Sequence, residues 1–392
     1  MEVDRVGERT EGLAMTRWMP GVFALLTLGS AVAQPLLPRQ STADEQARFL
    51  SGLRVPTGSM LEGFQKTPGY FEHGKTYAET WRGFHRKYFS PMRRWSAENV
   101  LPRVGRVGVL YYLFGGPDFI NAYALFPNAP VYVLGGLEPV GSVMPPERLS
   151  ADQALAGLAN LRESTSVTLQ FSHFITKDMK VDLEETEFKG VMPILYSFVA
   201  LAGGQIVGSD YVGIDGGGQV VPLVSSTVPS GMVPGLRIVF RKDGGAAQTL
   251  YYVEADLSDG SFKLDGGLAH WMAGLGPGVS YLKAASYLMH ESYFSTVRDF
   301  LLSNSTAILQ DDSGIPLRDF LGADWQLAFF GSYTGTLELF DKYVQGDLLQ
   351  AYRTPGGARD LPFGTGYKWK PGESNLMLAV RAPVAPRAVP VE

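Results

Sequence analysis

The chain has 392 residues, of which 45% are hydrophobic and 19% are charged, so it can bury a large core in one large domain or two. Its formal net charge of −5 provides no basic field for nucleic acid, and the lack of cysteine excludes disulfides, thiolate metal sites and thiol nucleophiles. No pair of its five histidines has the spacing of a helical zinc motif, which argues against a histidine-rich metal site.

The N-terminus has the layout of a secretory signal peptide. Arg17 precedes an apolar run, Gly21 to Leu28, that is too short to span a bilayer, and a small-x-small cleavage signal follows at Ala31 to Ala33. We expect residues 1–33 to be the signal peptide, with residues 1–14 as an extension ahead of the true start at Met15; the alternative is a buried helix. This predicts a periplasmic or secreted bacterial protein. Such a location disfavours ATP, NAD and S-adenosylmethionine as cofactors, because these are cytoplasmic pools.

Residues 34–102 are expected to be a helical N-terminal segment. A first helix is predicted over Ala43 to Leu53, with Thr42 and Glu45 spaced as a capping box. A longer helix is predicted from Tyr77 to Ala97, with a wide aromatic face and a kink or a break at Pro91. Its many basic residues indicate a solvated face, and the alternative is a surface for a polyanion.

The next stretch predicts a parallel βαβ unit. Two apolar runs, Val107–Leu113 and Val131–Leu134, have the length of buried strands. The turn Gly115-Gly116-Pro117-Asp118 and a short helix, Phe119 to Leu125, lie between them. In a parallel unit of this kind, the loops at the carboxyl ends of the strands line the ligand crevice.

The remaining elements alternate between helix and strand. A β-hairpin is predicted because two alternating runs flank the turn Asp243-Gly244-Gly245. The expected helices cover Ser150–Leu161, Gly190–Ala202, Val279–Ser303 and Gly335–Val344. The expected strands cover Gln205–Ile214, Gln219–Val224, Leu236–Lys242, Thr249–Leu257, Ile308–Gln310, Trp325–Tyr333 and Asn375–Val380.

This pattern predicts an α/β protein with a mixed, mainly parallel sheet flanked by helices and an added antiparallel hairpin. We expect an α/β region over residues 103–185 and a mixed α/β region over 186–381. The boundary between them is placed near the charged stretch Lys180–Lys189. The tail, residues 382–392, is rich in Pro and Val and is expected to be disordered. No apolar run after the leader reaches the ~20 residues of a transmembrane helix.

The first candidate site combines Asp118 and Glu138, which follow the two strands of the βαβ unit. Two carboxylates there would serve as acid and base or hold a hard cation. Alternatively, Asp118 caps the short helix and Glu138 ends a strand. The pattern also resembles the first half of a nucleotide or S-adenosylmethionine fold, in which an acid after the second strand contacts a ribose. The Gly-x-Gly-x-x-Gly spacing is missing.

The second candidate is the helix predicted after Gly278, on which Ser280, Lys283, Tyr287 and His290 would share one face. Ser280 and Lys283 form an S-x-x-K sequence, which resembles the serine–lysine motif of penicillin-binding proteins and β-lactamases. In that resemblance the lysine activates the serine, and Gly364-Thr365-Gly366 matches only part of the K-T-G motif. The alternatives are a polar cleft without that chemistry, or side chains that cover the core.

The third candidate is the acidic turn at Asp311 and Asp312. Adjacent acids after a strand could present one carboxylate to a crevice or hold calcium or magnesium, although the D-x-D-x-D-G pattern is missing. The alternative is an Asx turn in which a carboxylate accepts a backbone hydrogen bond.

Three functions remain open from the sequence. The first is a hydrolase-like enzyme acting on a small or polymeric extracytoplasmic substrate. Its catalytic residues would be Asp118, Glu138, Lys283, His290 and Asp311, and its ligand-binding residues would be Ser280, Tyr287 and Asp312. The second is a non-enzymatic cell-envelope or ligand-binding protein, in which aromatics contact sugar or lipid, among them Trp81, Trp95, Trp271 and Trp325. The third is a relative of the nucleotide or S-adenosylmethionine fold that lacks that cofactor. The sequence identifies no cofactor or metal, and nucleic acid is not an expected partner.

Overall fold

A computed structural model describes residues 40–171, 187–322 and 324–382, which belong to one compact unit. The predicted signal peptide and almost all of the C-terminal tail lie outside the described residues, as does most of the expected boundary near Lys180–Lys189. No helix within the described ranges combines the length and apolarity needed to cross a bilayer.

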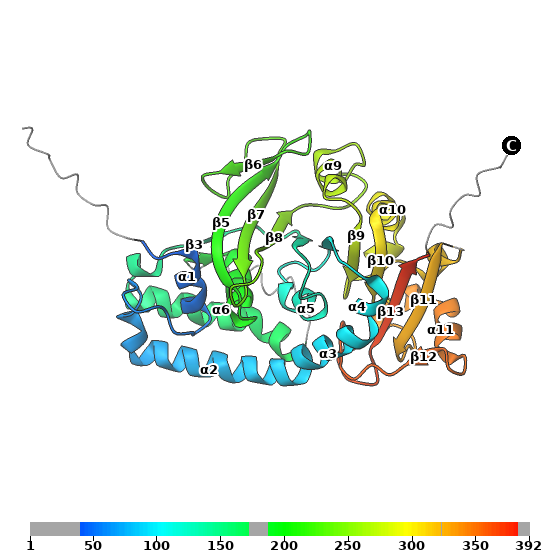
Figure 1. The fold of residues 1–392 in the computed structure, drawn as a ribbon, viewed down its shortest axis with the longest axis horizontal. Coiled ribbons are helices and arrows are strands. Elements are labelled where there is room, and N and C mark those ends of the chain that lie inside the picture. Colours follow the sequence, from blue (N-terminus) through cyan, green and yellow to red (C-terminus); the bar gives the residue numbers. More distant parts are fainter. Residues whose placement is uncertain (1–39, 172–186, 323, 383–392) are drawn as a thin grey trace, which may run out of the picture. The chain divides into compact units, whose positions relative to one another are not determined.

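The described residues are organised around one eleven-stranded mixed sheet (Figure 1). Its five central strands are all parallel. They are, in spatial order, β10 (Ser305–Gln310), β9 (Gly278–Leu282), β1 (Val109–Tyr112), β2 (Val131–Gly136) and β8 (Gln248–Glu254).

Both wings of the sheet are built mainly by antiparallel pairing. Beyond β8 lie β7 (Val233–Arg241), β5 (Gln205–Ile214) and β6 (Val220–Leu223), each antiparallel to its neighbour. Beyond β10 lie β13 (Asn375–Arg381), β11 (Trp325–Gly331) and β12 (Ala358–Arg359), and only β12 pairs in parallel. The α/β class, the mixed sheet and the β7–β8 hairpin are confirmed, but a mainly parallel sheet is not.

The predicted βαβ unit is present. Val109 pairs with Val131 and Tyr112 with Leu134, so β1 and β2 run in the same direction. The connecting helix α5 spans Phe119–Leu125, as the sequence predicts, and is buried along its whole length. Apolar side chains leave β1 on both faces, which explains why its run reads as continuous rather than alternating.

Helices cover both faces of the sheet. On one face, Leu110 and Tyr112 share a core with helices from the first half of the chain; on the other, Val109 and Tyr111 share a core with later helices. The first group comprises α1 (Ala43–Leu50), α2 (Pro68–Phe84), α3 (Ser90–Asn99), α5, α6 (Ala151–Phe171) and α8 (Met192–Leu201). The second comprises α9 (Gly267–Gly274), α10 (Ser295–Asn304) and α11 (Gly346–Arg353). Smaller elements are α4 (Leu101–Val104) and the two-stranded sheet β3 (Ser142–Val143) with β4 (Phe188–Lys189).

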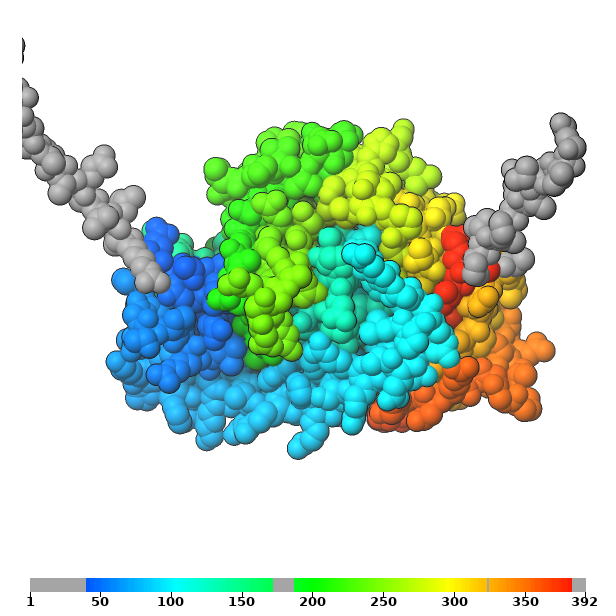
Figure 2. All heavy atoms as spheres, viewed as in Figure 1, coloured from blue at the N-terminus to red at the C-terminus, as the bar shows by residue number. Residues whose placement is uncertain are grey.

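The N-terminal helices follow the sequence closely. The capping box of α1 is formed, since the Glu45 amide donates to Thr42 Oγ1 and the Thr42 amide donates to the Glu45 carboxylate. The predicted long helix is divided into α2 and α3 by a π-helical turn, His85–Phe89, and Pro91 lies in the first turn of α3. Figure 2 shows this cyan stretch against the orange C-terminal part, where the ring centroid of Trp95 lies 5.0 Å from that of Phe330.

Two predicted helices need correction. The helix over Val279–Ser303 is wrong: Gly278–Leu282 forms β9, and α10 begins only at Ser295. The five residues of β9 are all buried between β1 and β10, and this tertiary pairing outweighs a helical spacing that arose by coincidence. Gly335–Val344 contains only a 3₁₀-helical segment, Glu338–Tyr343.

Candidate functional site

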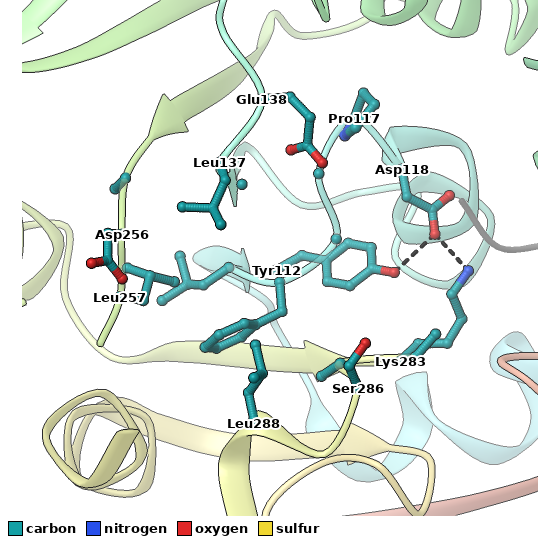
Figure 3. A pocket seen from close by; sticks show the side chains of 18 of the residues that line it. Tyr112, Pro117, Asp118, Leu137, Glu138, Asp256, Leu257, Lys283, Ser286 and Leu288 are labelled. Carbon is teal, nitrogen blue, oxygen red and sulfur yellow. Dashed lines mark hydrogen bonds and ion pairs between the residues drawn. The ribbon is translucent and has the colours of Figure 1, made fainter. Parts of the chain in front are cut away.

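A pocket of ≈ 180 Å³ lies at the carboxyl ends of the parallel strands (Figure 3). The chain leaves β1 toward β2 on one side, whereas it leaves β9 toward β10 on the other. The loops after β1 and β9 therefore diverge, which is the position where open α/β sheets bind ligands. The pocket is lined by these two loops and by those after β2 and β8.

Glycines let the β1 and β2 loops approach each other. A Cβ on Gly135 would lie 2.9 Å from the Leu113 carbonyl oxygen, and one on Gly115 would lie 2.5 Å from the Tyr112 ring. A Cβ on Gly136 would lie 2.2 Å from Glu138 Oε2 and 3.1 Å from the Gly116 Cα. The Gly-Gly pairs thus provide the space into which the Glu138 carboxylate folds.

Glu138 follows β2 and is held against the third parallel strand. The Tyr252 hydroxyl donates to the Glu138 carbonyl oxygen at 2.8 Å and to its Oε2 at 3.2 Å. Burial and the Glu138 charge raise the pKa of Tyr252 well above its ordinary value, so the phenol remains a donor. Glu138 is only 6% exposed, yet it lines the pocket, and Figure 3 shows its carboxylate beside Pro117.

A buried ion pair forms the polar end of the pocket. Lys283 Nζ lies 2.5 Å from Asp118 Oδ2, and the Tyr112 hydroxyl donates to the same oxygen at 2.8 Å. The Asn121 amide donates to Asp118 Oδ1 at 2.8 Å. Asp118 is the N-cap residue of α5, as the alternative interpretation expected, but its side chain makes no capping bond to the helix. Burial and the Asp118 charge raise the pKa of Tyr112 well above its usual value.

The opposite end of the pocket is apolar, with one acid at its border. Leu137, Leu257 and Leu288 line it together with Phe294. Asp256 follows β8 and accepts hydrogen bonds from the Ser258 amide and the Ser261 hydroxyl. These bonds lower its pKa, so Asp256 is an anion at neutral pH.

The predicted residues fall into three groups. Asp118, Glu138 and Lys283, from three different strand ends, line the pocket. Asp311, Asp312 and Tyr287 do not line the pocket: Tyr287 ends the loop that follows β9, and it donates its hydroxyl to Asp312 at 2.5 Å. Ser280 and His290 are not among the lining residues.

The S-x-x-K interpretation is wrong, because Ser280 lies within β9 rather than on a helix, and Lys283 follows the strand and binds Asp118. Ser280 Oγ instead lies 2.7 Å from Ser305 Oγ. The ring of His290 lies 5.4 Å from that of Tyr287 and 5.5 Å from that of Tyr343. Burial, then the Arg318 charge, lowers the pKa of His290 to about 4, so its imidazole is neutral at pH 7.

The turn after β10 holds two acids in a buried setting. Burial, then the charge of Asp312, raises the pKa of Asp311 to about 7, and burial also raises the pKa of Asp312. Asp311 Oδ1 accepts from the Ser313 amide at 3.0 Å, so the Asx turn considered for this stretch is present.

Sequence reasoning missed three residues of the site. Asp256 follows β8, but it fell inside the strand predicted over Thr249–Leu257, so the strand-end rule that identified Glu138 did not reach it. Tyr112 and Tyr252 lie within strands, and nothing in their spacing separates them from core residues. The highlighted tryptophans do not line the pocket; Trp95 and Trp271 are buried, and the Trp271 ring centroid lies 5.0 Å from that of Tyr251.

Across the described ranges, no group of three His, Asp or Glu side chains could hold a metal ion. Comparison of the chain with protein-family models, with curated proteins and with solved structures finds no match.

Proposed function

We propose that this protein binds a cationic nucleoside of the S-adenosylmethionine type at the carboxyl ends of β1, β2, β8 and β9. The observation that carries the proposal is the position of Glu138, a buried acid after the second strand of a doubly wound sheet. Counted along the chain, the parallel strands β8, β2, β1, β9 and β10 stand in the order 3-2-1-4-5, which nucleotide-binding folds share. The likeness is one of architecture, and the function is argued from the site.

Glu138 would accept hydrogen bonds from the ribose hydroxyls. It lies about 20 residues after the Gly-Gly turn, where such folds place this acid. Its carbonyl oxygen and Oε2 are tethered by Tyr252, which fixes the carboxylate next to Gly116. A carboxylate fixed in this way is suited to a diol, because it can accept hydrogen bonds from two hydroxyls.

The charges of the pocket favour a cationic ligand over a phosphate. The Gly115, Gly116 and Asp118 amides all donate to backbone carbonyls within the protein, so these donors do not face a pyrophosphate. The Asp118 carboxylate stands at the start of α5, and Glu138 and Asp256 add further negative charge. A sulfonium is compatible with this environment, whereas a pyrophosphate is repelled.

The two ends of the pocket suit the two ends of such a ligand. The apolar end, with Leu137, Leu257 and Leu288, would take the base. The Lys283–Asp118 pair offers a cation and an anion side by side to a carboxylate and an ammonium, the charges of an α-amino acid. A bound S-adenosylmethionine would supply an activated methyl group, which makes group transfer the reaction class that we infer.

The hydrolase-like alternative is less well supported. Asp118 is engaged by Lys283 and Tyr112, and the pocket lining contains no histidine. A hydrolase would therefore have to use Glu138 or Asp256 as its general base, and both carboxylates already accept hydrogen bonds from within the protein.

The predicted export bears on the source of the ligand. S-adenosylmethionine is a cytoplasmic compound, so a processed, exported protein would have to meet its nucleoside outside the cytoplasm. Fractionation of cells and sequencing of the mature N-terminus would decide between residues 1–33 as a cleaved leader and a protein that stays in the cytoplasm.

Isothermal titration of the full chain with S-adenosylmethionine and S-adenosylhomocysteine, against ATP and NAD, tests the proposal. We expect the first two to bind and Glu138→Gln to weaken them about 10- to 100-fold, since a hydrogen bond to a charged group contributes roughly 1.5–3 kcal/mol. Glu98→Gln, an exposed acid on α3, is the matched control and should bind as the wild type does. No binding by the wild type, or equal binding by Glu138→Gln, would overturn the proposal.

A further inference from the structure

The loop after β9 is held in a strained conformation. Ala284, Ser286 and Tyr287 have φ angles of 52°, 50° and 60°, a region that residues other than glycine seldom occupy. Such conformations cost of order 1–3 kcal/mol each and persist only where the surroundings enforce them. Three of them within four residues, in a loop that lines the pocket, require a dedicated support.

The support for the start of this loop comes from the turn after β10. Asp311 Oδ2 accepts the Ala284 amide at 2.9 Å, and Ser313 Oγ accepts the Ala285 amide at 2.8 Å. Ser313 is itself fixed, because its amide donates to Asp311 Oδ1 at 3.0 Å and its hydroxyl donates to the same oxygen at 2.5 Å. Two consecutive amides of the strained loop are thus received by one side-chain pair.

The end of the loop is held by the second acid. The Tyr287 hydroxyl donates to Asp312 Oδ2 at 2.5 Å, and the Asn375 amide group donates to Asp312 Oδ1 at 2.7 Å. The ring of Tyr343 stacks on that of Tyr287, with centroids 5.1 Å apart and an interplanar angle of 4°. Asn375 begins β13, so the loop is fixed to the next strand of the sheet as well.

A third segment closes over the acids. Tyr367 donates its hydroxyl to the Ala284 carbonyl oxygen at 2.9 Å. A Cβ on Gly366 would lie 2.3 Å from Asp311 Oδ2, so only glycine permits this close approach. Asp311 is 5% exposed and Ser313 is 1% exposed, and neither lines the pocket.

We propose that Asp311, Asp312 and Ser313 form a positioning clamp that holds the strained loop Lys283–Tyr287 in the shape that the ligand pocket requires. The clamp acts through the loop and does not touch the ligand. Lys283, Ala284, Ala285 and Ser286 face the pocket from the same loop, so relaxation of the φ angles would displace the lysine from Asp118 and reshape the wall. Sites need supports of this kind, because small misplacements of a contacting group are costly. The inference rests on the proposed function for its ligand.

The test uses Asp311→Asn in the full chain, measured at pH 8, where the wild-type carboxylate is ionised. Asparagine has the shape of aspartate, but an NH₂ group replaces one of the two carboxylate oxygens. This group donates hydrogen bonds, so it cannot accept the Ala284 or the Ser313 amide that the oxygen accepted. Tyr287→Phe removes only the hydroxyl at the other end of the loop. Ser280→Ala is the matched control, because it removes the buried hydrogen bond between Ser280 on β9 and Ser305 on β10 without changing the loop. The measurements are amide hydrogen exchange of the peptide covering 283–290 without ligand, and titration with S-adenosylmethionine.

Asp311→Asn and Tyr287→Phe are expected to exchange at least tenfold faster in this peptide and to bind at least tenfold more weakly. Ser280→Ala is expected to leave both quantities unchanged. The clamp is overturned if peptide 283–290 exchanges in both clamp variants at the wild-type rate. It is also overturned if both variants bind S-adenosylmethionine with unchanged affinity. If the wild type fails to bind, the proposed function is refuted instead, and faster exchange in the clamp variants still supports the clamp. Tyr287→Phe decides the matter if Asp311→Asn does not fold.

Discussion

Gly136→Ala should remove the proposed ribose contact without replacing a titratable residue. The added Cβ would lie 2.2 Å from Glu138 Oε2 and 2.9 Å from the Tyr252 hydroxyl, so the carboxylate must withdraw by about 1 Å to reach ordinary contact. Overpacking of this kind costs about 1–3 kcal/mol of folding free energy. Loss of a hydrogen bond to the charged carboxylate costs roughly 1.5–3 kcal/mol of binding, or about 10- to 100-fold in Kd.

The assay is titration of the variant with S-adenosylmethionine, with urea unfolding in parallel. Gly83→Ala is the control, since nothing lies within 4 Å of its added Cβ in the interior of α2. That change should stabilise the fold by roughly 0.5–1 kcal/mol and leave binding intact. Full affinity in Gly136→Ala would refute the claim that the Glu138 carboxylate contacts the ligand.

Three further predictions concern charge and stability. Lys283→Met leaves the buried Asp118 carboxylate without its lysine and should lower the free energy of unfolding by about 3–5 kcal/mol. Adding Asp118→Asn to the same chain should recover part of this loss. Urea titration measures the stability of the single and the double variant, and equal stability of the two would contradict the prediction. Because burial raises the folded-state pKa of Asp311 to about 7, the folded chain holds a proton that the unfolded chain releases between about pH 4 and 7, so this group lowers stability as pH rises through that window. The unfolding free energy of the wild type, relative to that of Asp311→Asn, should therefore fall as the pH rises through this window. A difference that does not change with pH would contradict the raised pKa of Asp311. Thr42→Ala should cost about 1 kcal/mol through loss of the α1 capping box, as thermal unfolding would show, whereas an unchanged Tm would mean that the cap contributes nothing.

Local sequence chemistry was sufficient for the βαβ unit. The Gly-Gly-Pro-Asp turn separates an apolar strand from a helix, and the helix Phe119–Leu125 has the predicted bounds. The strand-end rule also brought Asp118 and Glu138 to one pocket, because both follow parallel strands. These features depend on residues close together in the chain.

Long-range pairing could not be predicted in the same way. β2 pairs with β8, which begins more than a hundred residues later, and β13 inserts between β10 and β11. Gly278–Leu282 is a strand because it pairs with β1 and β10, and its own residues do not distinguish it from a helix. Lys283 reached the site although its predicted helix was wrong, and Tyr252 entered it only through the register of β8.

The two outermost strands determine how the wide sheet meets other chains. One edge is β12, which has only two residues, and the other is β6, a four-residue strand that carries Pro222 and so lacks one backbone donor. Short edges and an edge proline hinder a foreign strand from extending the ladder. The outermost strand at each margin of this wide sheet is therefore a poor template for the addition of another chain.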